Sequence, residues 1–253
     1  MQDTYIGDEG KGFPLVLVHG FLGSSIMWKP QIDFFKDYFR VITPDLPGYG
    51  KSNKAKSHNT IQSIANLLLD CLGEKKIDKF HLLGHSMGGM IVQDMAKKSG
   101  EKISKLVCYS TGPRGEMPGR FETVERSREN FKKNGLEITA KNIAKTWFIK
   151  GEEAKYFDIC IDSGKQTSME TADNSLVAIK NWNGVDALKN IKNETLIIWG
   201  DQDKSYNLEQ VETLEKNIKN SKLTIFKNSS HCVHLEQPNE FNNTVKNFLL
   251  SSS

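Results

Sequence analysis

The sequence predicts an α/β protein in which a mostly parallel central sheet is flanked by helices and interrupted by a helical insertion. Three observations lead to this prediction. From residue 13 to about residue 108, short apolar segments alternate with segments of helical spacing. Between about residues 111 and 191 the segments have helical spacing with no strand pattern between them, and after residue 195 the alternation returns. Such alternation is typical of a parallel sheet with helices on both faces.

The first half of the chain contains four predicted strands and two predicted helices. The strands are short apolar runs, the pattern of strands buried on both faces, at residues 15–18, 41–43, 80–83 and 105–109. Between the second and third of these, apolar residues recur at helical spacing from Ile61 to Leu72. A second helical pattern begins after Ser86 and includes Met87 and Met95.

The second half places a block of helices before the last strands. An apolar stripe at helical spacing ends on Trp147 and Phe148, and later segments continue in the same manner. The elements predicted after this block are strands at 195–199 and 223–226, and helices at 208–218 and 239–250. We therefore expect residues 1–111 and 191–253 to form the core domain. Residues 112–190 are expected to form a helical cap over the C-terminal edge of the sheet, where open α/β sheets bind ligands.

Composition and charge exclude several classes of protein. A hydrophobic fraction of 38% is enough for a packed core and excludes a disordered chain. The balance of 34 basic against 31 acidic side chains argues against a nucleic-acid binder. No apolar run approaches the ~18 residues of a membrane span, and residues 1–4 lack the start of a secretory signal. We therefore expect a cytoplasmic protein without nucleic-acid or membrane partners.

The four cysteines are far apart in the sequence. Cys71, Cys108, Cys160 and Cys232 include no C-x-x-C pair. This spacing predicts small buried side chains in a reducing compartment, with neither a disulfide framework nor a metal site.

The strongest chemical signal is the run Gly84-His85-Ser86-Met87-Gly88. It fits the pattern G-x-S-x-G and lies directly between a predicted strand and a predicted helix. In that context the turn is so tight that the serine adopts a strained backbone and exposes its Oγ. Ser86 is thus the candidate nucleophile, and the N–H of Met87 is a candidate donor to an oxyanion.

A second candidate donor lies in the loop after the first predicted strand. The run is His19-Gly20-Phe21. An acyl-transfer site needs another N–H opposite the nucleophile, and the loop after an adjacent strand can supply it. The N–H of Phe21 is the candidate.

A serine nucleophile at neutral pH needs a base, and the base needs an acid that orients it. His231 is the first histidine after the predicted strand at 223–226, and we favour it over His234, which lies nearer the closing helix. Asp203 follows the strand at 195–199 and is preferred to Asp201, which is better placed to bond the backbone of its turn.

Five motifs in order give the chain a resemblance to the α/β-hydrolase superfamily along nearly its whole length. They occupy residues 19–23, 44–52, 84–89, 199–203 and 231–238. The resemblance implies an α/β-hydrolase fold with Ser86 as nucleophile, Asp203 as acid and His231 as base. It also implies Phe21 and Met87 as oxyanion donors. The order Ser, Asp, His along the chain is that of this superfamily.

Within the superfamily, the segments 134–148 and 178–197 resemble 3-oxoadipate enol-lactonases and their carboxylesterase relatives. A serine at residue 86, in place of aspartate, argues against haloalkane dehalogenases and epoxide hydrolases. The interpretation is a serine hydrolase that needs no cofactor and cleaves a small carboxylic ester or lactone. Two alternatives remain at this stage: a carbon–carbon bond hydrolase of the meta-cleavage type, and a ligand receptor on the same fold.

Two groups of side chains are candidates for binding the substrate. The first is aromatic and consists of Trp28, Trp147, Phe148 and Trp182, which together with Phe21 and Met87 are expected to line an apolar pocket.

The second group is basic. Only five of the 34 basic residues are arginines, and four of these fall between residues 114 and 128. Arg114 and Arg120, on the loop entering the cap, are candidates to bind a substrate carboxylate. The competing interpretation is a solvated helix face, with Arg126 and Arg128 paired to nearby glutamates.

Overall fold

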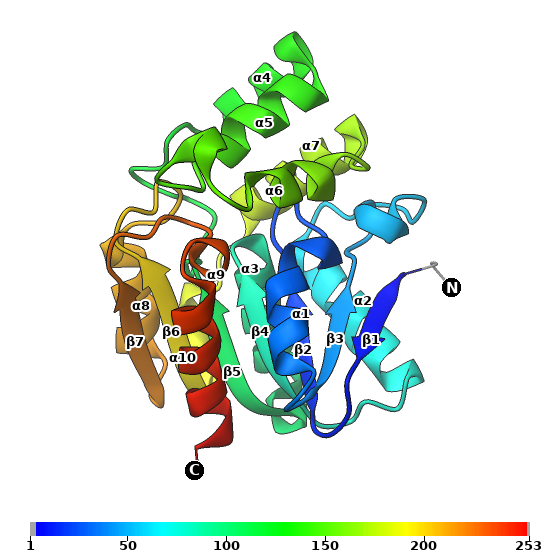
Figure 1. The fold of residues 1–253 in the computed structure, drawn as a ribbon, viewed down its shortest axis with the longest axis vertical. Helices are drawn as coiled ribbons and strands as arrows, with labels where there is room; N and C mark the ends of the chain where they lie inside the picture. Colours follow the sequence, from blue (N-terminus) through cyan, green and yellow to red (C-terminus); the bar gives the residue numbers. More distant parts are fainter. Residues whose placement is uncertain (1–3, 252–253) are drawn as a thin grey trace.

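The computed structural model describes residues 4–251, so the two ends of the predicted core domain, 1–3 and 252–253, lie outside the described residues. Its centre is a seven-stranded sheet in the order β1-β3-β2-β4-β5-β6-β7 (Figure 1). The strands are β1 (Ile6–Glu9), β2 (Pro14–Val18), β3 (Arg40–Pro44), β4 (Phe80–His85), β5 (Ile103–Tyr109), β6 (Glu194–Gly200) and β7 (Ser221–Phe226). Only β1 runs antiparallel to its neighbour, and every other pairing is parallel. The predicted α/β fold with a mostly parallel sheet is therefore confirmed.

Helices cover both faces of the sheet. One face carries α1 (Lys29–Phe35) and α10 (Pro238–Leu250), preceded by the short α9 (Val233–Glu236), and the other carries α2 (Ile61–Glu74), α3 (Met87–Ser99) and α8 (Leu208–Asn217) (Figure 1). Two separate apolar cores result, one under each layer of helices. Short 3-10 helices occupy η1 (Ser25–Trp28), η2 (Gly50–Ser52), η3 (Gly100–Lys102), η4 (Gly151–Glu153) and η5 (Val185–Asn190).

Local sequence explains the elements that the periodicity predicted. All six residues of β4 are buried, because both faces of this central strand are covered. Helix α2 turns one apolar stripe, from Ile61 to Leu72, toward the sheet, and Thr60 caps its first turn by accepting a hydrogen bond from the Ser63 N–H at 3.2 Å.

The sequence analysis did not predict strand β1 or helix α1. The edge strand β1 has four residues, of which two are exposed and none is fully buried, so it shows no apolar run. Helix α1 has only seven residues, directly follows η1 and has a proline in its first turn. Both elements are shorter than the windows in which periodicity can be detected.

Residues 112–190 contain the helices α4 (Val124–Asn134), α5 (Leu136–Lys145), α6 (Phe157–Gly164) and α7 (Met169–Asn181). Figure 1 shows these four helices together beyond one end of the sheet. The two ends of the segment are fastened to each other by an antiparallel bridge between Arg114 and Asn183. The Gly115 N–H also donates to the Trp182 carbonyl at 2.9 Å. The segment thus leaves and re-enters the sheet layer at one place.

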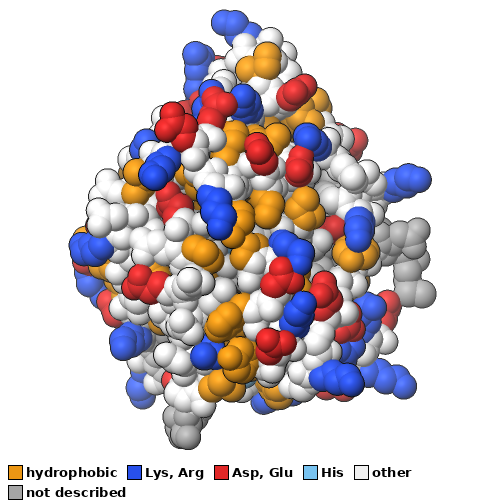
Figure 2. All heavy atoms as spheres, in the orientation of Figure 1, with side chains coloured by type: hydrophobic (Ala, Val, Ile, Leu, Met, Phe, Trp, Pro, Cys, Tyr) orange, Lys and Arg blue, Asp and Glu red, His pale blue; other side chains and the backbone are white. Residues whose placement is uncertain are grey.

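The surface carries mixed charge. On the face seen in Figure 2, basic and acidic side chains are interspersed among apolar ones. Across residues 4–251, no helix is both long enough and apolar enough to cross a membrane.

Close packing between α3 and β2 leads to a prediction about stability. A methyl group on Gly88 would lie 2.4 Å from the Val18 carbonyl oxygen, whereas a methyl group on Gly73, in exposed helix α2, would meet nothing within 4 Å. We expect Gly88→Ala to lower the free energy of unfolding by about 1–3 kcal/mol or more, because backbone cannot move aside. Gly73→Ala should raise it by up to about 1 kcal/mol. Urea unfolding measures both, and equal effects would contradict the packing described.

Candidate active site

Ser86 stands at a strained turn between β4 and α3. Its backbone has φ 58° and ψ −120°, a conformation that L-residues rarely adopt. The surrounding chain holds it there. The Ser86 N–H donates to the Tyr109 carbonyl at 2.9 Å, and the Ser86 carbonyl accepts from the Thr111 hydroxyl and the Gly89 N–H, each at 2.8 Å. The strand, turn and helix therefore follow one another as the motif requires.

The loop after β2 approaches this turn closely. A methyl group on Gly20 would lie 2.9 Å from the Ser86 Cβ, so the backbone next to Phe21 can come near the serine only with glycine at residue 20. His19 fixes the loop: its Nδ1–H donates to the Gly20 carbonyl at 2.8 Å and its Nε2 accepts from the Leu46 N–H at 2.9 Å. This arrangement needs a neutral ring, and burial lowers the pKa of His19 accordingly.

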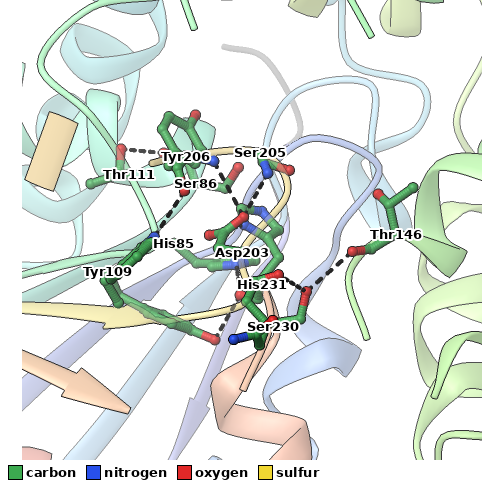
Figure 3. Close-up of polar contacts among 12 residues, drawn as sticks. His85, Ser86, Tyr109, Thr111, Thr146, Asp203, Ser205, Tyr206, Ser230 and His231 are labelled. Carbon is green, nitrogen blue, oxygen red and sulfur yellow. Dashed lines mark hydrogen bonds and ion pairs between the residues drawn. The ribbon is translucent and has the colours of Figure 1, made fainter. Parts of the chain in front are cut away.

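The predicted acid and base meet at the C-terminal edge of the sheet. His231 Nδ1 lies 2.9 Å from Asp203 Oδ2, and the two side chains are 2% and 0% exposed (Figure 3). The other carboxylate oxygen of Asp203 accepts from the N–H groups of Ser205 at 2.7 Å and Tyr206 at 3.2 Å. A carboxylate only accepts, so the shared proton sits on Nδ1 and Nε2 of His231 keeps a free lone pair.

The backbone of His231 is also held in place. Its carbonyl accepts two hydrogen bonds, from the Tyr109 hydroxyl at 3.0 Å and from His85 Nε2 at 3.1 Å. The His85 and His231 rings lie 4.6 Å apart between centroids. His85, the residue before Ser86, and Tyr109, at the end of the neighbouring strand β5, therefore both hold the backbone that carries the imidazole of His231.

The alternatives to the acid and the base have other partners. Asp201 Oδ1 accepts the Asn228 N–H at 2.9 Å, as expected of a carboxylate that bonds the backbone of its turn. His234 Nδ1 contacts the Tyr109 hydroxyl at 2.9 Å, and burial lowers the pKa of His234 to about 3. His234 is thus a neutral, structural ring beneath the site.

One of the four candidate pocket aromatics lies against the base. The Trp147 ring is 6.1 Å from the His231 ring, and its carbonyl accepts the Cys232 N–H at 3.0 Å. Trp147 also lines a cavity of about 230 Å³ between α5 and α6, with Leu22 and Cys160 in the same wall.

The other three aromatics lie elsewhere. Trp28 is buried on the α1 side of the sheet, with its ring 4.7 Å from His234. Phe148 packs against Phe157 inside the helical segment, and Trp182 is buried at the base of that segment. Residue type alone did not indicate which of the four aromatic side chains lies next to His231.

The arginines between 114 and 128 have different surroundings. Arg126 pairs with Glu129 on the surface at 3.2 Å, and Arg128 binds Asp173 through two hydrogen bonds of 2.6 and 2.9 Å. Arg126 matches the interpretation of a solvated helix face, whereas Arg128 binds an aspartate on α7 in place of a glutamate of its own helix. Arg114 lies in the bridge at the base of the segment.

Arg120 differs from the other three. It donates from Nη1 to the Glu122 carbonyl at 2.5 Å and to Ser127 Oγ at 3.2 Å, and it stacks over the Phe121 ring at 4.2 Å. Burial lowers its pKa, and electrostatic interactions with Tyr206 and Glu122 act in the opposite direction. Within residues 4–251, no carboxylate lies within ion-pair distance of this guanidinium.

The sequence analysis missed three polar side chains around the triad. Tyr206, Thr111 and Tyr109 surround Ser86 and His231 (Figure 3). Tyr109 and Thr111 lie at and just beyond the end of β5, which is one available signal, because the ends of parallel strands meet at the ligand-binding edge. In the part of the chain that the structure describes, no group of three or more His, Cys, Asp or Glu is arranged to hold a metal ion.

Comparison with known proteins identifies the family. The model of the α/β-hydrolase fold family matches residues 14–238, so the chain belongs to this family. A pimeloyl-[acyl-carrier protein] methyl ester esterase from Legionella pneumophila is 30% identical over 219 residues, which are 85% of this chain and 86% of that protein. The (E)-2-((N-methylformamido)methylene)succinate hydrolase of Acinetobacter baylyi is 26% identical, over 58% of this chain and only 55% of that protein.

A solved structure has the same fold over almost the whole chain. The enol-lactonase from Burkholderia xenovorans LB400 superposes with a TM-score of 0.90, covering 98% of this chain and 96% of that one. The two sequences are 22% identical. The chain therefore belongs to the α/β-hydrolase fold family, with esterases and an enol-lactonase among the proteins it resembles.

The buried, neutral His234 predicts a pH dependence of stability. Its pKa is about 3 in the folded protein against an ordinary value of 6.5, so below pH 6.5 the unfolded chain binds a proton that the folded chain does not. Stability is therefore lost as the pH falls from about 6.5 toward 3, by up to about 1.4 kcal/mol per pH unit. We expect His234→Gln to flatten this slope between pH 6 and 4.5 in urea unfolding. An unchanged slope would show that His234 does not titrate as described.

Proposed function

We propose that the protein is a serine hydrolase that needs no cofactor and cleaves a small carboxylic ester or lactone through an acyl-enzyme intermediate. The observation that carries the proposal is the buried pair of His231 and Asp203 beside the strained Ser86. A buried carboxylate that fixes one imidazole nitrogen leaves the other free to act as a base. The family and its esterase members support the same chemistry.

In the proposed reaction, Ser86 Oγ attacks the carbonyl carbon while His231 Nε2 takes the serine proton. The carbonyl oxygen becomes an oxyanion, which the N–H groups of Phe21 and Met87 stabilise. The carbon–oxygen bond to the leaving group then breaks, and His231 returns its proton to that oxygen. Water, activated by His231, attacks the acyl group, releases the acid and restores Ser86.

Two features support the assignment of the oxyanion donors. Met87 is the first residue of α3, so its N–H has no acceptor within the helix and lies at the positive end of the helix dipole. Phe21 follows Gly20, whose backbone is in contact with Ser86 and is held by His19.

We further propose that residues 112–190 act as the cap of this site. Trp147 contacts His231 and lines the cavity of about 230 Å³, which suits an apolar part of a small substrate. Arg120 is the better of the two arginine candidates to bind a substrate carboxylate, because it is a part-buried cation that interacts with Tyr206, a residue of the candidate site.

Removing the nucleophile tests the mechanism. We expect Ser86→Ala to lower kcat for p-nitrophenyl acetate by about 10⁴-fold or more, because no other group near His231 attacks the ester. The free energy of unfolding should not fall, since the substitution removes one half-buried hydroxyl. Activity retained in the purified variant would exclude Ser86 as the nucleophile.

Two neighbouring aspartates provide the matched control. Asp203→Asn should lower kcat by about 10³- to 10⁴-fold, because the amide no longer fixes the tautomer of His231. Asp201→Asn, which only weakens the bond to the Asn228 N–H, should change kcat less than about threefold. The reverse ranking would reassign the acid. Binding of an ester without turnover in the unmodified protein would favour a receptor.

Arg120 allows a test of the substrate's charge. We expect Arg120→Lys to raise KM for esters that carry a free carboxylate by about tenfold, with little change for neutral esters of the same size, because lysine cannot form the bidentate pair. Arg126→Lys is the control, since Arg126 pairs with Glu129 on the surface. Equal effects of Arg120→Lys on acidic and neutral esters would exclude a carboxylate anchor.

A further inference from the structure

Tyr206 is held rigidly within the candidate active site. Its N–H donates to Asp203 Oδ1 at 3.2 Å, and its carbonyl accepts from Trp199 Nε1 at 2.9 Å. The residue is only 3% exposed. These bonds to Asp203 and to Trp199, near the end of β6, thus fix the backbone from which the Tyr206 ring extends.

The ring extends from the base to the nucleophile. It lies nearly parallel to the His231 ring, with 5.8 Å between centroids and 16° between planes. At its far end, the hydroxyl interacts with the side chains of Ser86 and Thr111.

The hydroxyl is suited to donate a hydrogen bond rather than to act as a base. Burial raises the pKa of Tyr206 well above its ordinary value, so the phenol stays protonated. The Thr111 hydroxyl gives its proton to the Ser86 carbonyl at 2.8 Å, so Tyr206 is the donor in its interaction with Thr111 Oγ1, and the same proton can be directed at a group that binds beside Ser86.

We propose that Tyr206 is a further catalytic residue, whose hydroxyl donates a hydrogen bond to the leaving-group oxygen of the ester. This inference rests on the proposed function. The leaving oxygen has to lie within reach of His231 Nε2, because it takes its proton from there. Tyr206 covers one face of that imidazole and carries its hydroxyl to Ser86, so the hydroxyl lies on the leaving-group side.

The bond changes remain those of acyl transfer. A bond forms between Ser86 Oγ and the carbonyl carbon, and the bond from that carbon to the leaving oxygen breaks. The leaving oxygen takes the serine proton through His231. Tyr206 keeps its own proton and stabilises the negative charge that develops on the leaving oxygen before protonation is complete.

This role also points to a class of substrate. A hydrogen bond to the leaving oxygen matters most for poor leaving groups, since an activated phenolate departs without help. The site is therefore built for unactivated alkyl esters or aliphatic lactones.

The test compares two esters of one acid. For Tyr206→Phe we expect kcat/KM for ethyl acetate to fall by roughly 10- to 100-fold, and that for p-nitrophenyl acetate to fall less than about threefold. Tyr49→Phe is the matched control, because Tyr49 is also buried and donates to Ser175 Oγ at 2.7 Å. It should leave the ratio of the two kcat/KM values unchanged.

The outcomes separate the inference from the proposed function. Equal losses on both esters would overturn the role of Tyr206 and leave a packing role. Ester hydrolysis that survives Ser86→Ala would instead overturn the proposed function, whatever Tyr206→Phe does. Tyr206→Met, checked for folding by circular dichroism, serves as a second deletion of the hydroxyl, and it should reproduce the selective loss on ethyl acetate.

Discussion

The strained backbone of Ser86 is the constraint on which the rest of the site depends. A residue at φ 58° and ψ −120° costs on the order of 1–3 kcal/mol and persists only where its surroundings over-determine it. Here Tyr109, the last residue of β5, offers its carbonyl to the Ser86 N–H, and Thr111, two residues further on, donates its hydroxyl proton to the Ser86 carbonyl. The neighbouring backbones come so close that residues 20 and 88 can only be glycine without displacement of main chain.

One of three clustered histidines differs from the other two in its electrostatic surroundings. The centroid of the His85 ring lies 4.6 Å from that of His231 and 5.3 Å from that of His234, and all three residues are buried. Burial lowers the pKa of His85 and His234, which therefore stay neutral. Of the three, only His231 faces a carboxylate, that of Asp203, which in the proposed reaction would stabilise the imidazolium. The carboxylate of Asp203 thus distinguishes His231 from the two other imidazoles.

The sequence analysis located the candidate site where local chemistry determines position, and the roles of its residues stay predictions. Ser86, Asp203 and His231 each follow a strand that could be predicted, and the C-terminal ends of parallel strands meet at one edge. It failed where orientation depends on packing across the fold. Trp28 and Trp147 are equally aromatic, yet one is buried under α1 and the other contacts His231. Tyr206 was missed because a single residue in a loop has no periodicity, and its direction is set by Asp203 and Trp199.

The base is attached to the helical segment as well as to the sheet. The Cys232 N–H donates to the Trp147 carbonyl, and Ser230 Oγ donates to the Thr146 carbonyl at 3.2 Å. Glu236 links the same two segments a second time, because its carboxylate accepts the Ile149 N–H at 2.7 Å and the Ser230 N–H at 2.6 Å.

These bonds have a geometric consequence. Residues 146–149 cannot shift without moving the backbone on both sides of His231, whereas Asp203 is held by its own loop. The 2.9 Å contact between His231 and Asp203 thus joins a residue bonded to the helical segment with a residue held by the loop after β6. Substitutions in residues 146–149 are therefore expected to shift His231, although none of these residues belongs to the proposed triad.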